Sequence, residues 1–107
     1  MALNSRTIRV ADTPDLIVQF RSKNAPYSIS TATTKEIRLQ NPSGTTVVKP
    51  GLLITDGTDG LLHYQANNTD FTAADIGFWK IQGRVVNSDG TEFSTEPEKF
   101  EVTEKLV

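Results

Sequence analysis

The sequence contains no cysteine, so it can form no disulfide, no thiolate nucleophile and no zinc–thiolate site. It contains one histidine, His63, and a transition-metal site would need a second imidazole or a thiolate to complete it. The expected fold therefore depends on its hydrophobic core alone, and no metal or other cofactor is expected.

The sequence also lacks long apolar runs and any excess of one charge. Its 107 residues include 13 acidic and 11 basic side chains, and no basic run that would neutralise several phosphates. No stretch approaches the roughly 20 apolar residues that cross a bilayer. Residues 1–6 lack the apolar core of a secretory signal peptide. We therefore expect a protein made in the cytoplasm, with neither nucleic-acid nor membrane partners.

The longest alternation of apolar and polar residues surrounds the only tryptophan. Trp79, Ile81 and Val85 fall on one face of residues 76–86, and Lys80 falls on the other. A period of two is that of a half-buried strand, because successive side chains point to opposite faces of a sheet. The pattern predicts a central strand with Trp79 in the core.

Shorter alternating segments occur at residues 16–20, 35–40, 61–66 and 99–102. Asn41–Gly44 and Asn87–Gly90 have the composition of tight hairpin turns. Turn signals at about every 8–12 residues predict an all-β, immunoglobulin-like antiparallel sandwich of about seven to eight strands without a disulfide. Residues 1–107 should form one domain, with residues 104–107 as a tail.

Residues 22–33 are predicted to be a long connection, and residues 67–77 hold the one expected helical turn, capped by Thr69 or Asp70. The predicted core includes Phe20, Leu39, Tyr64, Trp79, Ile81 and Phe100.

No pattern of catalytic or metal-binding residues is found. His63 is expected on the solvent side of a strand. Four aspartates offer oxygens that calcium accepts, but the spacing is not that of an EF-hand, and aspartate commonly bonds its own backbone in turns. These are Asp56, Asp59, Asp70 and Asp75. With no phosphate-binding loop, serine elbow or Cys–His pair, catalytic and metal residues are predicted as none, and the protein as not an enzyme.

Five apolar or aromatic residues are expected on outward faces or on a loop. Apolar groups surrounded by polar ones mark interaction sites, so these residues are the predicted interface with a second copy or another protein. They are Ile17, Tyr27, Ile29, Phe78 and Val86.

The order of strand and turn motifs resembles the immunoglobulin-like domain of bacteriophage tail and baseplate proteins, including the N-terminal domain of the baseplate upper protein family. The motifs concerned are residues 16–21, 37–45, 56–64, 76–83, 89–90 and 100–102. The resemblance implies a non-enzymatic virion structural protein that contacts itself or other virion proteins in a tail, baseplate or capsid. It also implies location in the virion.

A second hypothesis is a surface adhesion or carbohydrate-binding module, with Tyr27, Tyr64 or Trp79 as the platform for a sugar ring. The two hypotheses differ in where the aromatic residues lie. A sugar-binding protein needs an exposed aromatic beside polar groups, whereas the alternation places Trp79 in the core.

Overall fold

The computed structural model describes residues 7–104, so most of the predicted tail at 104–107 lies outside the described residues. The chain forms eleven short strands and one 3-10 turn, and residues 7–104 contain no α-helix. The elements are β1 (Thr7–Arg9), β2 (Asp15–Gln19), β3 (Arg21–Ser22), β4 (Ala25–Pro26), β5 (Ala32–Gln40), β6 (Thr46–Pro50), β7 (Leu52–Leu53), β8 (Leu61–Gln65), η1 (Ala73–Asp75), β9 (Gly77–Asn87), β10 (Glu92–Ser94) and β11 (Glu98–Thr103).

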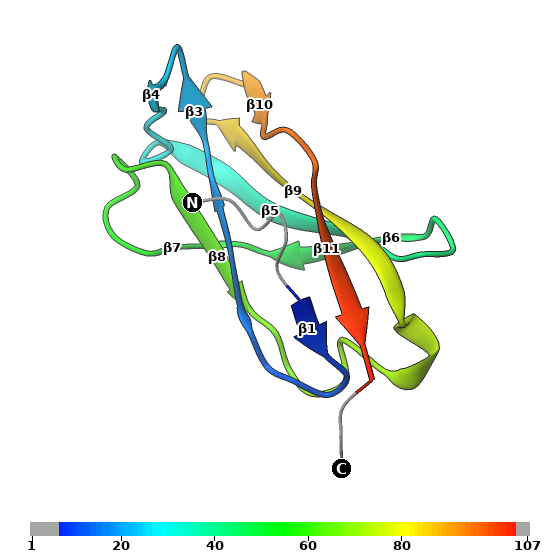
Figure 1. Ribbon diagram of the computed structural model, residues 1–107. Coiled ribbons are helices and arrows are strands. Elements are labelled where there is room, and N and C mark those ends of the chain that lie inside the picture. The colour runs from blue at the N-terminus through cyan, green and yellow to red at the C-terminus, as the bar shows by residue number, and fades with distance from the viewer. Residues whose placement is uncertain (1–6, 105–107) are drawn as a thin grey trace.

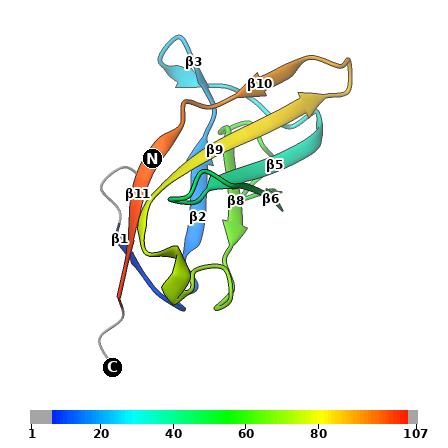
Figure 2. The same cartoon turned by 90° about the vertical axis from the view of Figure 1, so that its right-hand side faces the viewer.

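The strands build two sheets that pack face to face (Figure 1). The larger sheet has the order β1-β11-β9-β5-β6, with β10 also paired to β9, and the smaller has the order β2-β8-β7. The strands of the two sheets cross obliquely (Figure 2). The predicted all-β, immunoglobulin-like sandwich without a disulfide is confirmed. The strands are more numerous than predicted because breaks at Phe20 and at residues 95–97 divide longer ones.

Strand β9 is the centre of the larger sheet, as its alternation predicts. It pairs with β5 on one side and with β10 and β11 on the other. Trp79, Ile81 and Val85 point into the core. The fully or nearly buried apolar residues of the described chain are Ile8, Leu16, Val18, Phe20, Ile29, Ile37, Leu39, Leu62, Ala66, Phe71, Trp79, Ile81, Val85, Phe100 and Val102.

Tyr64, expected in the core, is only partly buried and packs against the core from its edge. Its hydroxyl needs a polar partner, which a fully apolar interior would not supply.

Side chains from the facing side of the core pack directly against Gly83. A Cβ atom added there would lie 2.7 Å from Cγ2 of Val18 and 2.8 Å from Cζ of Phe20, both on the opposite side of the core. Glycine therefore completes the inward face of β9 by leaving room for the facing sheet.

The two predicted hairpin turns are confirmed and share one hydrogen-bond pattern. The Gly44 N–H donates to the Asn41 carbonyl at 2.9 Å, and the Gly90 N–H donates to the Asn87 carbonyl at 2.9 Å. The first turn joins β5 to β6, and the second joins β9 to β10.

Residues 22–33 are more ordered than predicted. Strands β3 and β4 form a small hairpin whose turn holds Lys23 and Asn24 at positive φ. The chain then turns inward, the Ile29 N–H donates to the Gly57 carbonyl, and β5 begins at Ala32. The polar composition of the segment conceals one apolar residue that the fold buries.

The 3-10 turn begins after Thr72 and not at Thr69 or Asp70. The Asp75 carboxylate accepts hydrogen bonds from the Thr72 N–H and hydroxyl, whereas the Thr69 hydroxyl donates to Asn67. Asp70 is unavailable as a cap because it binds Lys49 and Tyr64.

Candidate interaction surface

The most prominent exposed apolar feature is residues 47–54, which we call the edge segment. The described chain exposes six large apolar side chains, and the edge segment carries four of them. These four are Val47, Val48, Leu52 and Ile54. The segment includes the last strand of the larger sheet and the last strand of the smaller one, β6 and β7. It therefore borders the open side of both layers.

Pro50 and Gly51 carry the chain from one sheet to the other within this segment. The Gly51 N–H still donates to the Lys35 carbonyl of β5 at 3.0 Å, and a Cβ atom on Gly51 would lie 2.6 Å from Leu62 Cδ2. The crossing is tight because it passes directly over a core side chain. Val47 and Val48, like Leu52 and Leu53, are consecutive apolar residues on strands, so in each pair one must point away from the core.

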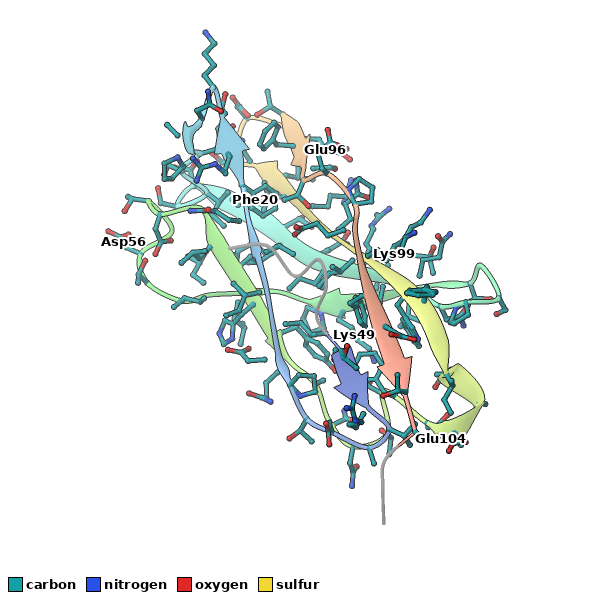
Figure 3. The ribbon with its side chains drawn as sticks, viewed as in Figure 1. Phe20, Lys49, Asp56, Glu96, Lys99 and Glu104 are labelled. Carbon is teal, nitrogen blue, oxygen red and sulfur yellow. The ribbon has the colours of Figure 1, made fainter. Side chains whose placement is uncertain are left out.

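A hydrogen-bonded cluster anchors the inner side of the edge segment. The Lys49 ammonium lies 3.0 Å from Asp70 Oδ1, and the Tyr64 hydroxyl donates to Asp70 Oδ2 at 2.7 Å. The ammonium also lies 5.7 Å from the centre of the Tyr64 ring. Figure 3 labels Lys49, near the middle of the view. The charge of the edge segment's one basic residue is therefore satisfied within the same chain.

The cluster changes the ionisation of its members. Burial opposes the charge on Asp70, but hydrogen bonds from the Asn67 N–H, Tyr64 and Lys49 outweigh it, so the pKa of Asp70 is lowered. The hydrogen bond to Asp70 is the main cause that raises the pKa of Lys49. Burial is the main cause that raises the pKa of Tyr64. Near neutral pH these shifts favour a charged Asp70 carboxylate, a charged Lys49 ammonium and a neutral Tyr64 hydroxyl.

We expect Asp70→Asn to reduce the free energy of unfolding by about 2–3 kcal/mol at neutral pH, because it removes charge-assisted hydrogen bonds at a largely buried site. A lowered folded-state pKa stabilises the fold above the unfolded pKa, and this contribution is lost as the pH falls through the folded value. The difference between wild type and variant should therefore shrink in acid. Denaturant unfolding at pH about 7 and about 2.5 measures it.

Asp56→Asn is the matched control, because Asp56 is exposed and its carboxylate only bonds the N–H and hydroxyl of Thr58 in a turn that asparagine also forms. An Asp70→Asn variant no less stable than this control at neutral pH would contradict the anchoring role of the cluster.

Shallow grooves lie on the sandwich surface, and two of them border elements already described. One, of about 490 Å³, lies between β2–β3 and the β10–β11 connection and is lined by Gln19, Arg21, Phe93, Ser94, Thr95, Glu96 and Glu98. Figure 3 labels Glu96 on that connection. The other, of about 230 Å³, is lined by Leu39, Asn41, Val47, Lys49, Thr69, Asp70, Asp75 and Trp79, and borders the edge segment.

The five residues predicted as an interface do not form one surface. Ile29 is buried at 0% exposure, which corrects its prediction as a loop contact. Tyr27 is partly buried, with its ring 4.5 Å from that of Phe93. Ile17 lies on the outer face of the smaller sheet, whereas Phe78 and Val86 lie on the outer face of the larger one.

Phe78 is the most exposed of the predicted interface residues, at 62%. The Lys99 ammonium lies 5.6 Å from its ring centre. Val86 is eight residues further along β9, about 26 Å at the usual rise of a strand. The alternation correctly places both side chains outward, but it contains no information about the distance between them.

The side chains considered for metal or catalytic chemistry lie in three separate places, of which one is the groove that Asp70 and Asp75 both line. His63 Nδ1 is 2.7 Å from Asp15 Oδ1 on the outer face of the smaller sheet. Asp56 and Asp59 bond the turn between β7 and β8, where Figure 3 shows Asp56 on an outlying loop. Within residues 7–104, no group of three or more His, Cys, Asp or Glu side chains is arranged to hold a metal ion. The same residues form no helix of the length and apolarity that a membrane crossing requires.

Comparison with known proteins finds similarity among solved structures. No family model matches the chain, and no curated protein matches it. Among solved structures, the chain is similar to CopC from Methylosinus trichosporium OB3b, with a TM-score of 0.59 and 20% sequence identity. The alignment covers 96% of this chain and 89% of the solved one. At this identity the likeness shows a shared sandwich fold.

This finding overturns the resemblance to phage baseplate domains, and with it the expected phage structural role and virion location. The motifs behind that resemblance are alternating strands and Asn- or Asp-containing turns. Such features follow from the requirements of any antiparallel sandwich, so they do not distinguish one sandwich family from another.

Proposed function

We propose that the protein is a non-catalytic interaction module that associates with a second copy of itself through the edge segment. The observation that carries the proposal is the concentration of four of the six exposed large apolar side chains within residues 47–54. Val48 and Leu52 lie on the outer faces of different sheets, so the contact centres on β6, where Val47 and Val48 are adjacent and exposed along a sheet edge.

The charges of the edge segment also favour a second copy as the partner. Lys49 is the only charged residue of the edge segment, and the carboxylate of Asp70 in the same chain neutralises it. Two identical edges therefore meet without repulsion between like charges. The contacts available are few, which is typical of a weak association with a Kd of about 100 µM.

The positions of the other candidate residues support a role without catalysis or sugar binding. His63 and Asp15 lie on an outer sheet face and not among the residues that line the two grooves above. Trp79 is buried, and the Tyr64 hydroxyl is occupied by Asp70. These aromatic side chains do not present the open ring that stacks on a sugar.

Static light scattering over a wide range of concentrations tests the proposal. The wild-type mass should rise from 11.8 kDa toward twice that value as the concentration increases. Val48→Lys introduces one charge at an exposed position of the edge and should raise the Kd at least about tenfold. Phe78→Lys changes the net charge equally at another exposed apolar position and should leave the Kd unchanged.

A wild-type mass that stays at the monomer value up to millimolar concentration would disprove self-association. If Phe78→Lys weakened the dimer and Val48→Lys did not, the outer face around Phe78 would be the interface and the edge segment would not.

A further inference from the structure

Among residues 7–104, strand β6 pairs only with β5, so it has unpaired backbone groups on its outer side. Asn41 N–H donates to the Thr45 carbonyl, and Gly51 N–H donates to the Lys35 carbonyl, at the two ends of the β5–β6 ladder. In an antiparallel pair, only every second residue exchanges hydrogen bonds with its partner strand. Val47 and Lys49 therefore bond β5, and the backbone groups of Thr46 and Val48 point away from the sheet.

We infer that β6 pairs antiparallel with β6 of a second copy, about a two-fold axis that passes beside Val47. The inference rests on the proposed self-association and specifies its geometry. In this register Thr46 lies opposite Val48 of the second copy, and the symmetry-related pair repeats the contact. Each pair exchanges two backbone hydrogen bonds, and Val47 lies opposite its own counterpart. The two larger sheets become one continuous sheet.

The side chains suit this register. Lys49 would lie opposite Thr45, so the ammonium bound to Asp70 meets no second cation. Pro50 would lie opposite Gly44, and an added Cβ atom at Gly44 would have no atom within 4 Å. The proline ring, which ends the pairing because it has no N–H, therefore faces an open position. Opposed valines are favourable cross-strand neighbours.

Strand β2, the other five-residue strand at a sheet edge in residues 7–104, is less suited to a partner. Strand β2 borders the smaller sheet, but its side chains are buried or only partly exposed, whereas four of the five in β6 are exposed. Strand β7 has only two residues. An exposed edge strand with unpaired N–H and C=O groups is a template for another strand, and the one lysine of β6 is already neutralised by Asp70.

The absence of cysteine makes a direct test available. Directly opposed residues of a non-hydrogen-bonded antiparallel pair have Cα atoms about 4.5 Å apart, within the range that a disulfide spans. Val47→Cys, incubated with oxidised glutathione, should therefore form a covalent dimer at least about tenfold faster than Leu52→Cys or Phe78→Cys. Both control positions are more exposed than Val47, so exposure alone favours the controls.

Val48→Pro tests the backbone bonds separately. It removes an N–H that points away from β5, so the fold should persist while the Kd rises at least about tenfold. A melting temperature near that of wild type verifies the fold. If wild type dimerises but Val47→Cys cross-links no faster than the controls, or Val48→Pro dimerises normally, the register is wrong and self-association stands. If wild type is monomeric, both proposals fail.

Discussion

Replacing Trp79 with alanine is expected to reduce the free energy of unfolding by about 3–5 kcal/mol, the range for removing a large aromatic from a packed core. The indole lies against Phe71 and Phe100, with ring centroids 5.1 and 6.0 Å away. Its Nε1–H also donates to the Asp75 carbonyl at 2.7 Å, which attaches the 3-10 turn to β9. The variant therefore loses packing and leaves a partly buried carbonyl without its partner.

Phe78→Ala provides the comparison within the same strand. Phe78 is the next residue, yet its side chain is exposed on the opposite face, so the change should stay within about 0.5 kcal/mol. Chemical denaturation with tryptophan-independent detection, such as far-UV circular dichroism, measures both variants. Equal stability of the two variants would contradict the burial of Trp79 and the exposure of Phe78.

Gly60→Ala should be similarly damaging, by about 3 kcal/mol or more. Gly60 has φ of +73°, a left-handed conformation that costs other residues roughly 1–2 kcal/mol. A Cβ atom there would lie 2.5 Å from the Phe20 carbonyl oxygen and 2.8 Å from that of Tyr27. Both are backbone atoms that cannot rotate away, and overpacking of this kind adds about 1–3 kcal/mol.

The neighbouring hydrogen bonds explain why the backbone cannot yield at Gly60. Phe20 N–H donates to the Gly60 carbonyl, and Tyr27 N–H donates to the Phe20 carbonyl, each at 2.8 Å. Gly90→Ala separates the two costs, because Gly90 has φ of +91° with no atom near an added Cβ. Thermal and denaturant unfolding should show the smaller loss for Gly90→Ala. Equal losses would indicate that the crowding at Gly60 has no energetic effect.

Alternation along the chain was sufficient to predict most of the core and the fold class. Trp79, Ile81 and Phe100 are buried as expected, because a strand with one apolar face can satisfy it only by facing the other sheet. Ile29 and Phe71 were not predicted to be in the core because they lie outside strands. Their burial depends on how loops close over the ends of the sandwich, which no local period reveals.

The candidate surface was harder to predict for a different reason. Phe78 and Ile17 were identified as outward residues, but alternation does not say which sheet a strand joins or which strand lies at an edge. Val47 and Val48 become notable only once β6 is known to have one neighbour. The two consecutive valines were the sequence feature that could have indicated an exposed apolar side chain here, since one of them must face away from the core in any strand.

The parallel pairing of β1 with β11 determines how the molecule resists tension. Thr7 lies beside Glu101 and Arg9 beside Thr103, and the Val10 N–H donates to the Thr103 carbonyl at 3.0 Å (Figure 1). A force that pulls the two ends of the chain apart draws these neighbouring strands along each other in opposite directions. Their hydrogen bonds are then loaded in shear and resist together, whereas strands peeled apart yield one bond at a time. The first mechanical barrier to extension thus lies in a strand of only three residues, before the core around Trp79 bears any load.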